Sequence, residues 1–213
     1  MRIAFLHMTM GLTDRGSEVT LDILCQKLCQ KHKITVFQSG PVSPKPYHIK
    51  RVLPLKVAPP SAPTNIWEKL LSRMQLDKES TAVVAFTSAT IKDLQNFDPD
   101  IVIAVNGSLQ LKLLKQNHLK AKIVCFGHAG IGHHDRQTLL ARPDLFVALS
   151  KPAKEWASNL ASSKTKVVYI PNPIGVSKPK NLSLSLPSPI VLVVGAMTAY
   201  KNILGAVSAI KQT

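Results

Sequence analysis

Three histidines lie within a short glycine-rich segment, residues 127–135, which directly follows the apolar run 123–126. If that run is a strand of a parallel sheet, His128 lies at its carboxyl end, where such sheets bind their ligands. An imidazole there can hydrogen-bond a sugar or phosphate, transfer a proton or bind a metal. A metal needs three converging ligands, which this spacing does not indicate. We therefore predict no metal, take His128 as the catalytic candidate, and expect His133 and His134 to be exposed loop residues.

A second candidate is the polar loop 11–18, which follows the apolar run 3–6 and leads into a segment of helical pattern. Backbone N–H groups at the start of that helix, around Gly16, could hold a phosphate or a carboxylate. The loop is not the dinucleotide-binding fingerprint, because it has two glycines where that fingerprint has three. A plain turn that caps the helix explains the loop equally well, and both interpretations stay open.

The elements that must position these residues are short runs of β-branched and apolar side chains. The runs are almost continuously apolar instead of alternating, which is typical of parallel strands covered on both faces. They occupy residues 3–6, 34–37, 101–105, 123–126, 145–149, 167–170 and 190–194. Helical segments are predicted between them, at residues 16–31, 66–74, 80–97, 108–117, 151–160 and 202–211. Residues 98–100 are expected to form a turn into the strand at 101–105, and Ser108 is expected to cap the helix that follows it. The alternation predicts an α/β protein with a Rossmann-like, doubly wound parallel sheet.

Two proline-rich segments divide the chain. Residues 40–63 cannot form a regular helix, and we expect them to loop around a short edge strand at 49–53. Residues 171–189 are rich in proline and serine, a composition typical of linkers. The sequence therefore predicts one domain at 1–170, a linker at 171–189, and the incomplete start of a second Rossmann-like domain at 190–213.

Composition excludes some functions and leaves others open. The chain carries 27 Lys and Arg against 12 Asp and Glu, a formal charge of +15, which attracts phosphates of any kind. The basic residues are spread along the chain and aromatic residues make up only 5%, which argues against nucleic acid and leaves anionic lipid or a nucleotide-linked substrate. The three cysteines lack disulfide or metal spacing, and no apolar stretch is long enough to cross a bilayer. We expect reduced cysteines and a cytoplasmic protein that could lie peripherally at the inner face of the membrane.

Several motifs, taken in order, resemble those of the group 1, or family 4, retaining glycosyltransferases of GT-B fold. Gly16–Ser17–Glu18 resembles that family's Gly-Gly-Ala-Glu loop, and His128 resembles its strand-end histidine. Residues 97–102 resemble the family's Lys-Pro-Asp-hydrophobic segment, and residues 144–150 resemble its Asp-x-hydrophobic-Ala-hydrophobic-Ser segment. Residues 170–175 resemble its Pro-Asn-Gly turn. The opening of its donor domain is matched by Val193, Val194, Gly195, Lys201 and Asn202.

The resemblance implies two Rossmann-like domains facing each other across a cleft, of which this sequence covers the acceptor-side domain and the first strand and helix of the donor side. It implies glycan biosynthesis, with transfer of a sugar from a UDP- or GDP-sugar to a carbohydrate or lipid-linked acceptor, and no cofactor. In that mechanism His128 would line the sugar site and Lys201 would hold the donor diphosphate. The substrate-binding candidates are Gly16, Ser17, Glu18, Asn106 and Asn172.

Two alternatives remain at this stage. Ala196 stands where the family has an arginine that grips the donor diphosphate, and Lys201 could equally be a solvated lysine at the start of a helix. The chain is thus either a glycosyltransferase, or its N-terminal part, or a non-catalytic acceptor- or partner-binding domain of the same fold, truncated or needing a second subunit for the donor half.

Overall fold

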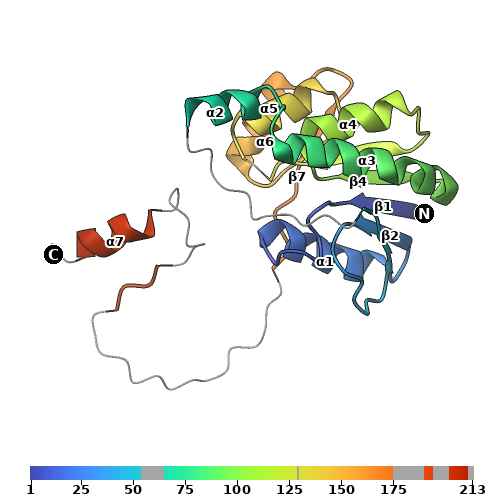
Figure 1. Cartoon of the computed structure of the whole chain (residues 1–213), viewed down its shortest axis with the longest axis horizontal. Helices are drawn as coiled ribbons and strands as arrows, with labels where there is room; N and C mark the ends of the chain where they lie inside the picture. Colours follow the sequence, from blue (N-terminus) through green and yellow to red (C-terminus); the bar gives the residue numbers. More distant parts are fainter. Residues whose placement is uncertain (54–64, 129, 175–189, 194–201, 211–213) are drawn as a thin grey trace. The chain divides into compact units, whose positions relative to one another are not determined.

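The computed structural model of the chain describes residues 1–53, 65–128, 130–174, 190–193 and 202–210 (Figure 1). Its centre is a seven-stranded sheet of order β3-β2-β1-β4-β5-β6-β7. Every neighbouring pair of strands is parallel. The strands are β1 (Arg2–Leu6), β2 (Lys33–Gln38), β3 (His48–Arg51), β4 (Ile101–Ala104), β5 (Lys122–Phe126), β6 (Leu145–Ala148) and β7 (Lys166–Tyr169). The predicted doubly wound parallel sheet is therefore confirmed, with β3 as the expected short edge strand.

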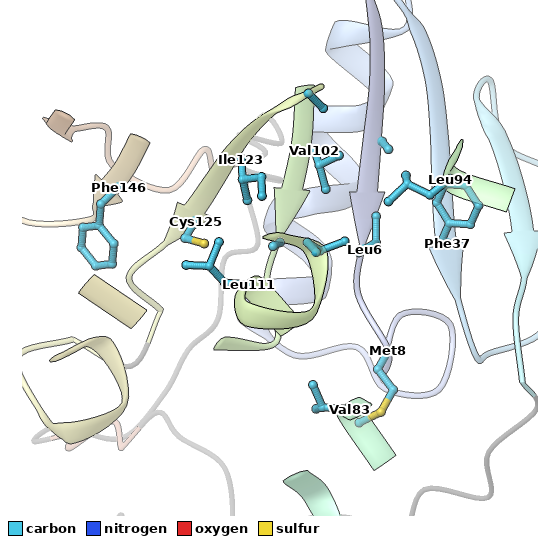
Figure 2. Close-up of a cluster of buried hydrophobic side chains, with 14 of the residues drawn as sticks. Leu6, Met8, Phe37, Val83, Leu94, Val102, Leu111, Ile123, Cys125 and Phe146 are labelled. Carbon is cyan, nitrogen blue, oxygen red and sulfur yellow. The ribbon is translucent and has the colours of Figure 1, made fainter. Parts of the chain in front are cut away.

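Helices cover both faces of this sheet. They are α1 (Gly16–Leu28), α3 (Lys78–Phe97), α4 (Gly107–Gln116), α5 (His133–Leu140) and α6 (Lys151–Leu160), whereas α2 (Ile66–Arg73) has no buried residue. Side chains of α3, α4, α5 and α6 pack into one buried cluster with alternate residues of the strands, whereas α1 packs into a second cluster on the opposite face. Figure 2 shows part of the first cluster, where Leu6, Val102 and Cys125 lie on the same side of the sheet as Leu111 of α4. Because successive residues of a strand point to opposite faces, this double covering explains the continuous apolar runs.

Capping residues begin and end two of these helices. The Asp77 carboxylate accepts a hydrogen bond from the Ser80 N–H at 2.7 Å and starts α3, and the Ser150 hydroxyl accepts from the Ala153 N–H at 3.2 Å and starts α6. Asp98 ends α3 in the left-handed region, with φ of 47°. These caps satisfy backbone groups that have no partner inside the helix.

Two aspartates bind the amino ends of β1 and β5. The Asp100 carboxylate accepts a hydrogen bond from the Arg2 backbone N–H at 2.6 Å, and the Asp144 carboxylate accepts from the Ile123 N–H at 2.9 Å. Each carboxylate precedes one strand and binds the start of its neighbour, so it fixes the register of the pair. The predicted turn at residues 98–100 is thus present and has this structural purpose.

Three local predictions are wrong. Residues 133–140 form helix α5, so His133 and His134 are exposed residues of a helix and not of a loop. Ser108 does not cap α4, because the helix already begins at Gly107 and the Ser108 hydroxyl accepts a hydrogen bond from Gln75 Nε2 at 2.6 Å. Residues 190–193, where a strand was expected, have no regular secondary structure.

The chain divides into two compact units, Met1–Gly175 and Val176–Thr213. The second unit contains helix α7 (Ile203–Ile210), in which no residue is buried. Lys201 and Ala196 lie outside the described residues, so the donor-phosphate interpretation of Lys201 stays a prediction. In the described part of the chain, no helix is long and apolar enough to cross a membrane.

Candidate functional site

The loops that follow β1, β4 and β5 meet at the carboxyl edge of the sheet, as they must when these strands are parallel and adjacent. They bring together His7, Glu18, Asn106 and His128, which with Thr9 we call the carboxyl-edge cluster. Glu18 comes from the first turn of α1, and the other four lie within about three residues after the end of a strand. Residues up to 121 positions apart in sequence therefore share one site.

Glu18 is a buried carboxylate held by hydroxyl groups. The side chains of Thr9 and Thr13 each donate a hydrogen bond of 2.7 Å to its Oε1, and Ser17 donates one of 2.7 Å to its Oε2. Burial alone would raise the pKa of Glu18, but these three hydrogen bonds, helped by the nearby His7, lower the pKa to about 2. Glu18 is therefore ionised at neutral pH and its oxygens are already used within the protein.

His7 is a neutral histidine whose tautomer follows from its neighbours. The Thr9 hydroxyl gives its proton to Glu18, so its oxygen can only accept, and His7 Nδ1, at 3.3 Å, must carry the proton between them. His7 Nε2 is then an acceptor. It lies 3.9 Å from Glu18 Oε1, beyond hydrogen-bond distance, and has no hydrogen-bond partner among the described residues. Burial lowers the pKa of His7 to about 4, although Glu18 opposes the shift and His128 adds to it.

His128 is half-buried and rests on an aromatic ring. Its imidazole stacks on Phe126, with ring centroids 5.6 Å apart and the planes 15° from parallel. Its Nε2 is buried and, within the described part of the chain, lacks a hydrogen-bond partner. Burial lowers the pKa of His128, against the opposing effect of Glu18. His128 is therefore uncharged at neutral pH, like His7.

Asn106 and Gly127 shape the edge around these groups. The Asn106 Oδ1 accepts hydrogen bonds from the Met8 backbone N–H at 3.0 Å and from Gln110 Nε2 at 3.3 Å, which ties the end of β4 to the loop after β1. At Gly127 a Cβ would lie 2.7 Å from Phe146 Cζ and 2.8 Å from Asp135 Oδ2, so only glycine fits there. The chain can therefore turn from β5 to His128 only because residue 127 has no side chain.

The cluster suits hydrogen bonding to hydroxyl groups better than acid–base chemistry at neutral pH. It holds one internally bonded carboxylate and two uncharged imidazoles, each with a buried nitrogen that has no protein partner among the described residues. A sugar hydroxyl both donates and accepts, so it can pair with an imidazole nitrogen of either kind. No group of three His, Cys, Asp or Glu side chains in the described ranges could hold a metal ion.

The other predicted site residues lie at the same edge but outside the cluster. Gly16 is exposed at the start of α1, with open space around the position of a Cβ, and no side chain caps the helix at Arg15. Asn172 is exposed after the end of β7, the far edge strand. Their roles in substrate binding, like those of Ser17, Glu18 and Asn106, stay predictions.

His7 is the residue that sequence reasoning missed. It is the first residue after β1, in the same position relative to its strand end as Gly127 after β5, and a rule that inspects each residue after a buried strand would have found it. The binding of Glu18 by Thr9 and Thr13 had no comparable signal, because it depends on how the loop folds back over α1.

One hollow of the described surface lies apart from the cluster. A hollow of about 630 Å³ lies beside α6 and the end of β7, lined by Lys151, Lys154, Glu155, Ser158, Asn159 and Tyr169. None of these residues belongs to the carboxyl-edge cluster, so this hollow and the candidate catalytic residues lie at different places on the surface.

Comparison with known structures gives the fold but little sequence identity. Sucrose-phosphate synthase from Thermosynechococcus elongatus superposes with a TM-score of 0.52 at 12% identity, covering 80% of this chain and 47% of the synthase. A second structure, of a segment of the same synthase, gives a TM-score of 0.51 at 12% identity and covers 80% of this chain and 88% of that one. The chain thus spans about half the length of the longer synthase structure, and the sheet is that of a GT-B glycosyltransferase domain.

Sequence comparison is more specific. No curated protein sequence matches the chain. The sequence profile of Glycosyltransferase Family 4, however, matches residues 15–178, a range that includes α1, every strand from β2 to β7, and all of the cluster except His7 and Thr9. The chain therefore belongs to glycosyltransferase family 4.

Proposed function

We propose that the chain is a retaining glycosyltransferase, or the acceptor-side part of one, that moves a sugar from a UDP- or GDP-sugar to a carbohydrate or lipid-linked acceptor. Membership of the family supports sugar transfer in general. The observation that carries the proposal for this chain is the pair of uncharged imidazoles, His7 and His128, at the carboxyl edge of the sheet. Reduced cysteines support a cytoplasmic location, since all three are free.

In this proposal each group has a separate task. His128, fixed by its stack on Phe126, hydrogen-bonds a hydroxyl of the transferred sugar. His7 accepts a second hydrogen bond at Nε2, and Glu18 holds the Thr9 hydroxyl that fixes the His7 tautomer. The uncapped N–H groups at the start of α1, beside Gly16, approach a phosphate or a hydroxyl through the backbone.

The test is calorimetric titration of the chain with UDP, GDP and ADP and with their sugar conjugates. We expect one nucleotide-sugar to bind, and His128→Ala to weaken that binding by about tenfold, the loss of one good hydrogen bond in a partly buried site. His133→Ala is the matched control, because His133 is exposed on α5 and should leave the affinity unchanged. If the two variants lost the same affinity, or if neither lost any, His128 would not contact the nucleotide-sugar.

A second function is favoured by one sequence feature, Ala196 in place of the family's arginine. Without that cation the chain would bind acceptor and depend on another subunit for the donor. It would then respond to acceptor glycans but not to any nucleotide-sugar, and Lys201→Ala would change nothing. Weaker UDP or GDP binding in Lys201→Ala, at an unchanged melting temperature, would instead assign the donor diphosphate to Lys201.

A further inference from the structure

Helix α2 turns its apolar face to solvent. Its apolar residues lie at spacings of three and four, Ile66, Trp67, Leu70, Leu71 and Met74, the last being the C-cap, so they form one face. All five are exposed, Ile66 by 78%, Trp67 by 73% and Met74 by 59% of their surface. No residue of α2 is buried. A helix in a globular protein normally packs such a face against the core, but this face is left uncovered within the first unit.

The polar face of α2 places two cations beside the apolar one. Lys69 and Arg73 lie four residues apart and both are exposed. On a helical projection they fall next to Ile66, at the border between the two faces. Trp67 has an amphipathic ring of the kind enriched at the level of lipid headgroups. An exposed apolar face bordered by basic residues is the pattern of a helix that lies in the plane of a membrane surface.

Contacts at the end of α2 place it beside the candidate site. Gln75, two residues after the helix, donates its hydrogen bond to Ser108 in the first turn of α4. The Asp77 carboxylate interacts electrostatically with His134, in the first turn of α5. The first turns of α4 and α5 follow β4 and β5 at the carboxyl edge, so α2 adjoins the edge that holds the cluster (Figure 1).

We propose that α2 is an interfacial helix that seats the carboxyl edge of the sheet on an anionic lipid bilayer. The apolar face enters the boundary between headgroups and acyl chains, and Lys69 and Arg73 remain at the level of the phosphates. The charge of the chain, +15, favours this occupant over a second copy, which would bring an equal charge against the same surface. The proposal deepens the proposed function, because it selects the lipid-linked acceptor over a free glycan and delivers it to the cluster from the membrane.

Vesicle binding tests the helix directly. The chain has two tryptophans, so the Trp156→Phe variant leaves Trp67 as the single fluorescent reporter. With vesicles of phosphatidylcholine and phosphatidylglycerol, we expect the emission of Trp67 to shift to the blue and to be quenched by brominated lipid. Pure phosphatidylcholine vesicles should give a much smaller change, and added salt should reduce the binding. Co-sedimentation of the unaltered chain with the same vesicles gives the same comparison without any substitution.

Two pairs of variants separate the apolar and the electrostatic contributions. Leu70→Glu should weaken binding by about tenfold or more, whereas Leu140→Glu, at the exposed end of α5 on the opposite edge, should not. Lys69→Gln should weaken binding to anionic vesicles by about fivefold at low salt, whereas Lys31→Gln, exposed beyond α1, should change it by less than about twofold. All four residues are exposed, so the variants should keep the melting temperature of the unaltered chain.

Each other outcome overturns the proposal. Equal binding to the two kinds of vesicle, no binding at low salt, or binding that Leu70→Glu leaves unchanged would show that α2 does not meet a membrane. Self-association that Leu70→Glu abolishes would assign the face to a second copy of the chain. Nucleotide-sugar binding is measured separately, without vesicles. If the vesicle experiment fails, the proposed sugar transfer still stands, and if the nucleotide-sugar titration fails, the membrane contact still stands.

Discussion

The histidine at the end of β1 should make the stability of the fold depend on pH. The pKa of His7 is lowered from 6.5 to about 4, mainly by burial. Between these values the unfolded chain holds a proton that the native chain does not, so stability falls as the pH falls. Linkage gives a loss of about 2 kcal/mol between roughly pH 7 and pH 4.5 from the difference in proton binding at this one side chain.

The assay is urea unfolding at these two pH values for the unaltered chain and for His7→Gln. The glutamine has no charge to gain, so the variant should lose about 2 kcal/mol less than the unaltered chain between the two pH values, whatever its stability at neutral pH. His48→Gln is the matched control, because His48 is exposed on the edge strand β3 and its replacement should retain the full loss.

Other groups near His7 define the useful pH range. His128 has its pKa lowered by burial and adds a smaller loss of the same sign, which His128→Gln would remove. Glu18, with its pKa lowered to about 2, contributes stability that is complete above its ordinary value of 4.5 and disappears as the pH falls toward 2, so it has little effect above about pH 4.5. If His7→Gln lost as much stability as the unaltered chain, the buried, neutral state assigned to His7 would be refuted.

Three further predictions concern the same edge of the sheet, and urea unfolding at neutral pH checks all of them. Glu18→Gln should lower the free energy of unfolding by about 2 kcal/mol, because three hydroxyl groups lose an ionised acceptor. Glu155→Gln on the exposed face of α6 should cost less than about 0.5 kcal/mol. Similar costs for the two variants would show that the hydrogen bonds to Glu18 add no stability. Gly127→Ala should lower the free energy of unfolding by about 2 kcal/mol or more, because the new Cβ would overlap with Phe146 and Asp135. Gly16→Ala is the control, because its Cβ would point into open space, and it should be neutral or slightly stabilising. An unchanged stability in Gly127→Ala would contradict the close packing at residue 127. Asn106→Ala should cost about 1–2 kcal/mol because the Met8 N–H loses its partner, and no loss of stability would mean that this bond does not hold the β1 loop.

The strands could be predicted because their signal is local. The runs 34–37, 101–105 and 145–149 are buried on both faces, and burial of that kind leaves a continuous apolar pattern in any parallel sheet. Helix α5 was missed because its apolar residues are few and its first turn is polar, so only Thr138 and Leu139, buried with Asp135, mark its inner side. The predicted cap at Ser108 failed because a residue 33 positions away bonds its hydroxyl, a contact that no local pattern contains.

The candidate site could be predicted only in outline. The position of His128 at the carboxyl edge follows from one rule, that ligands bind after the strands of a parallel sheet, and its role in binding stays a prediction. The hydrogen bonding and protonation of the site do not follow from that rule. Which carboxylate oxygen each hydroxyl binds, and hence which nitrogen of His7 carries the proton, depends on the path of the loop 7–15 in three dimensions.

The place of β1 in the middle of the sheet affects how the chain is made. β1 leaves the ribosome well before β4, one of its two neighbours, because the hydrogen bond from Arg2 to Asp100 spans 98 residues. At bacterial to eukaryotic synthesis rates that interval lasts about 5–20 s, during which one side of a strand that is apolar from residue 3 to residue 6 has no partner. Among the described strands, residues 3–6 therefore stay accessible for a long time to chaperones that bind extended apolar segments, and they remain so until β4 is complete.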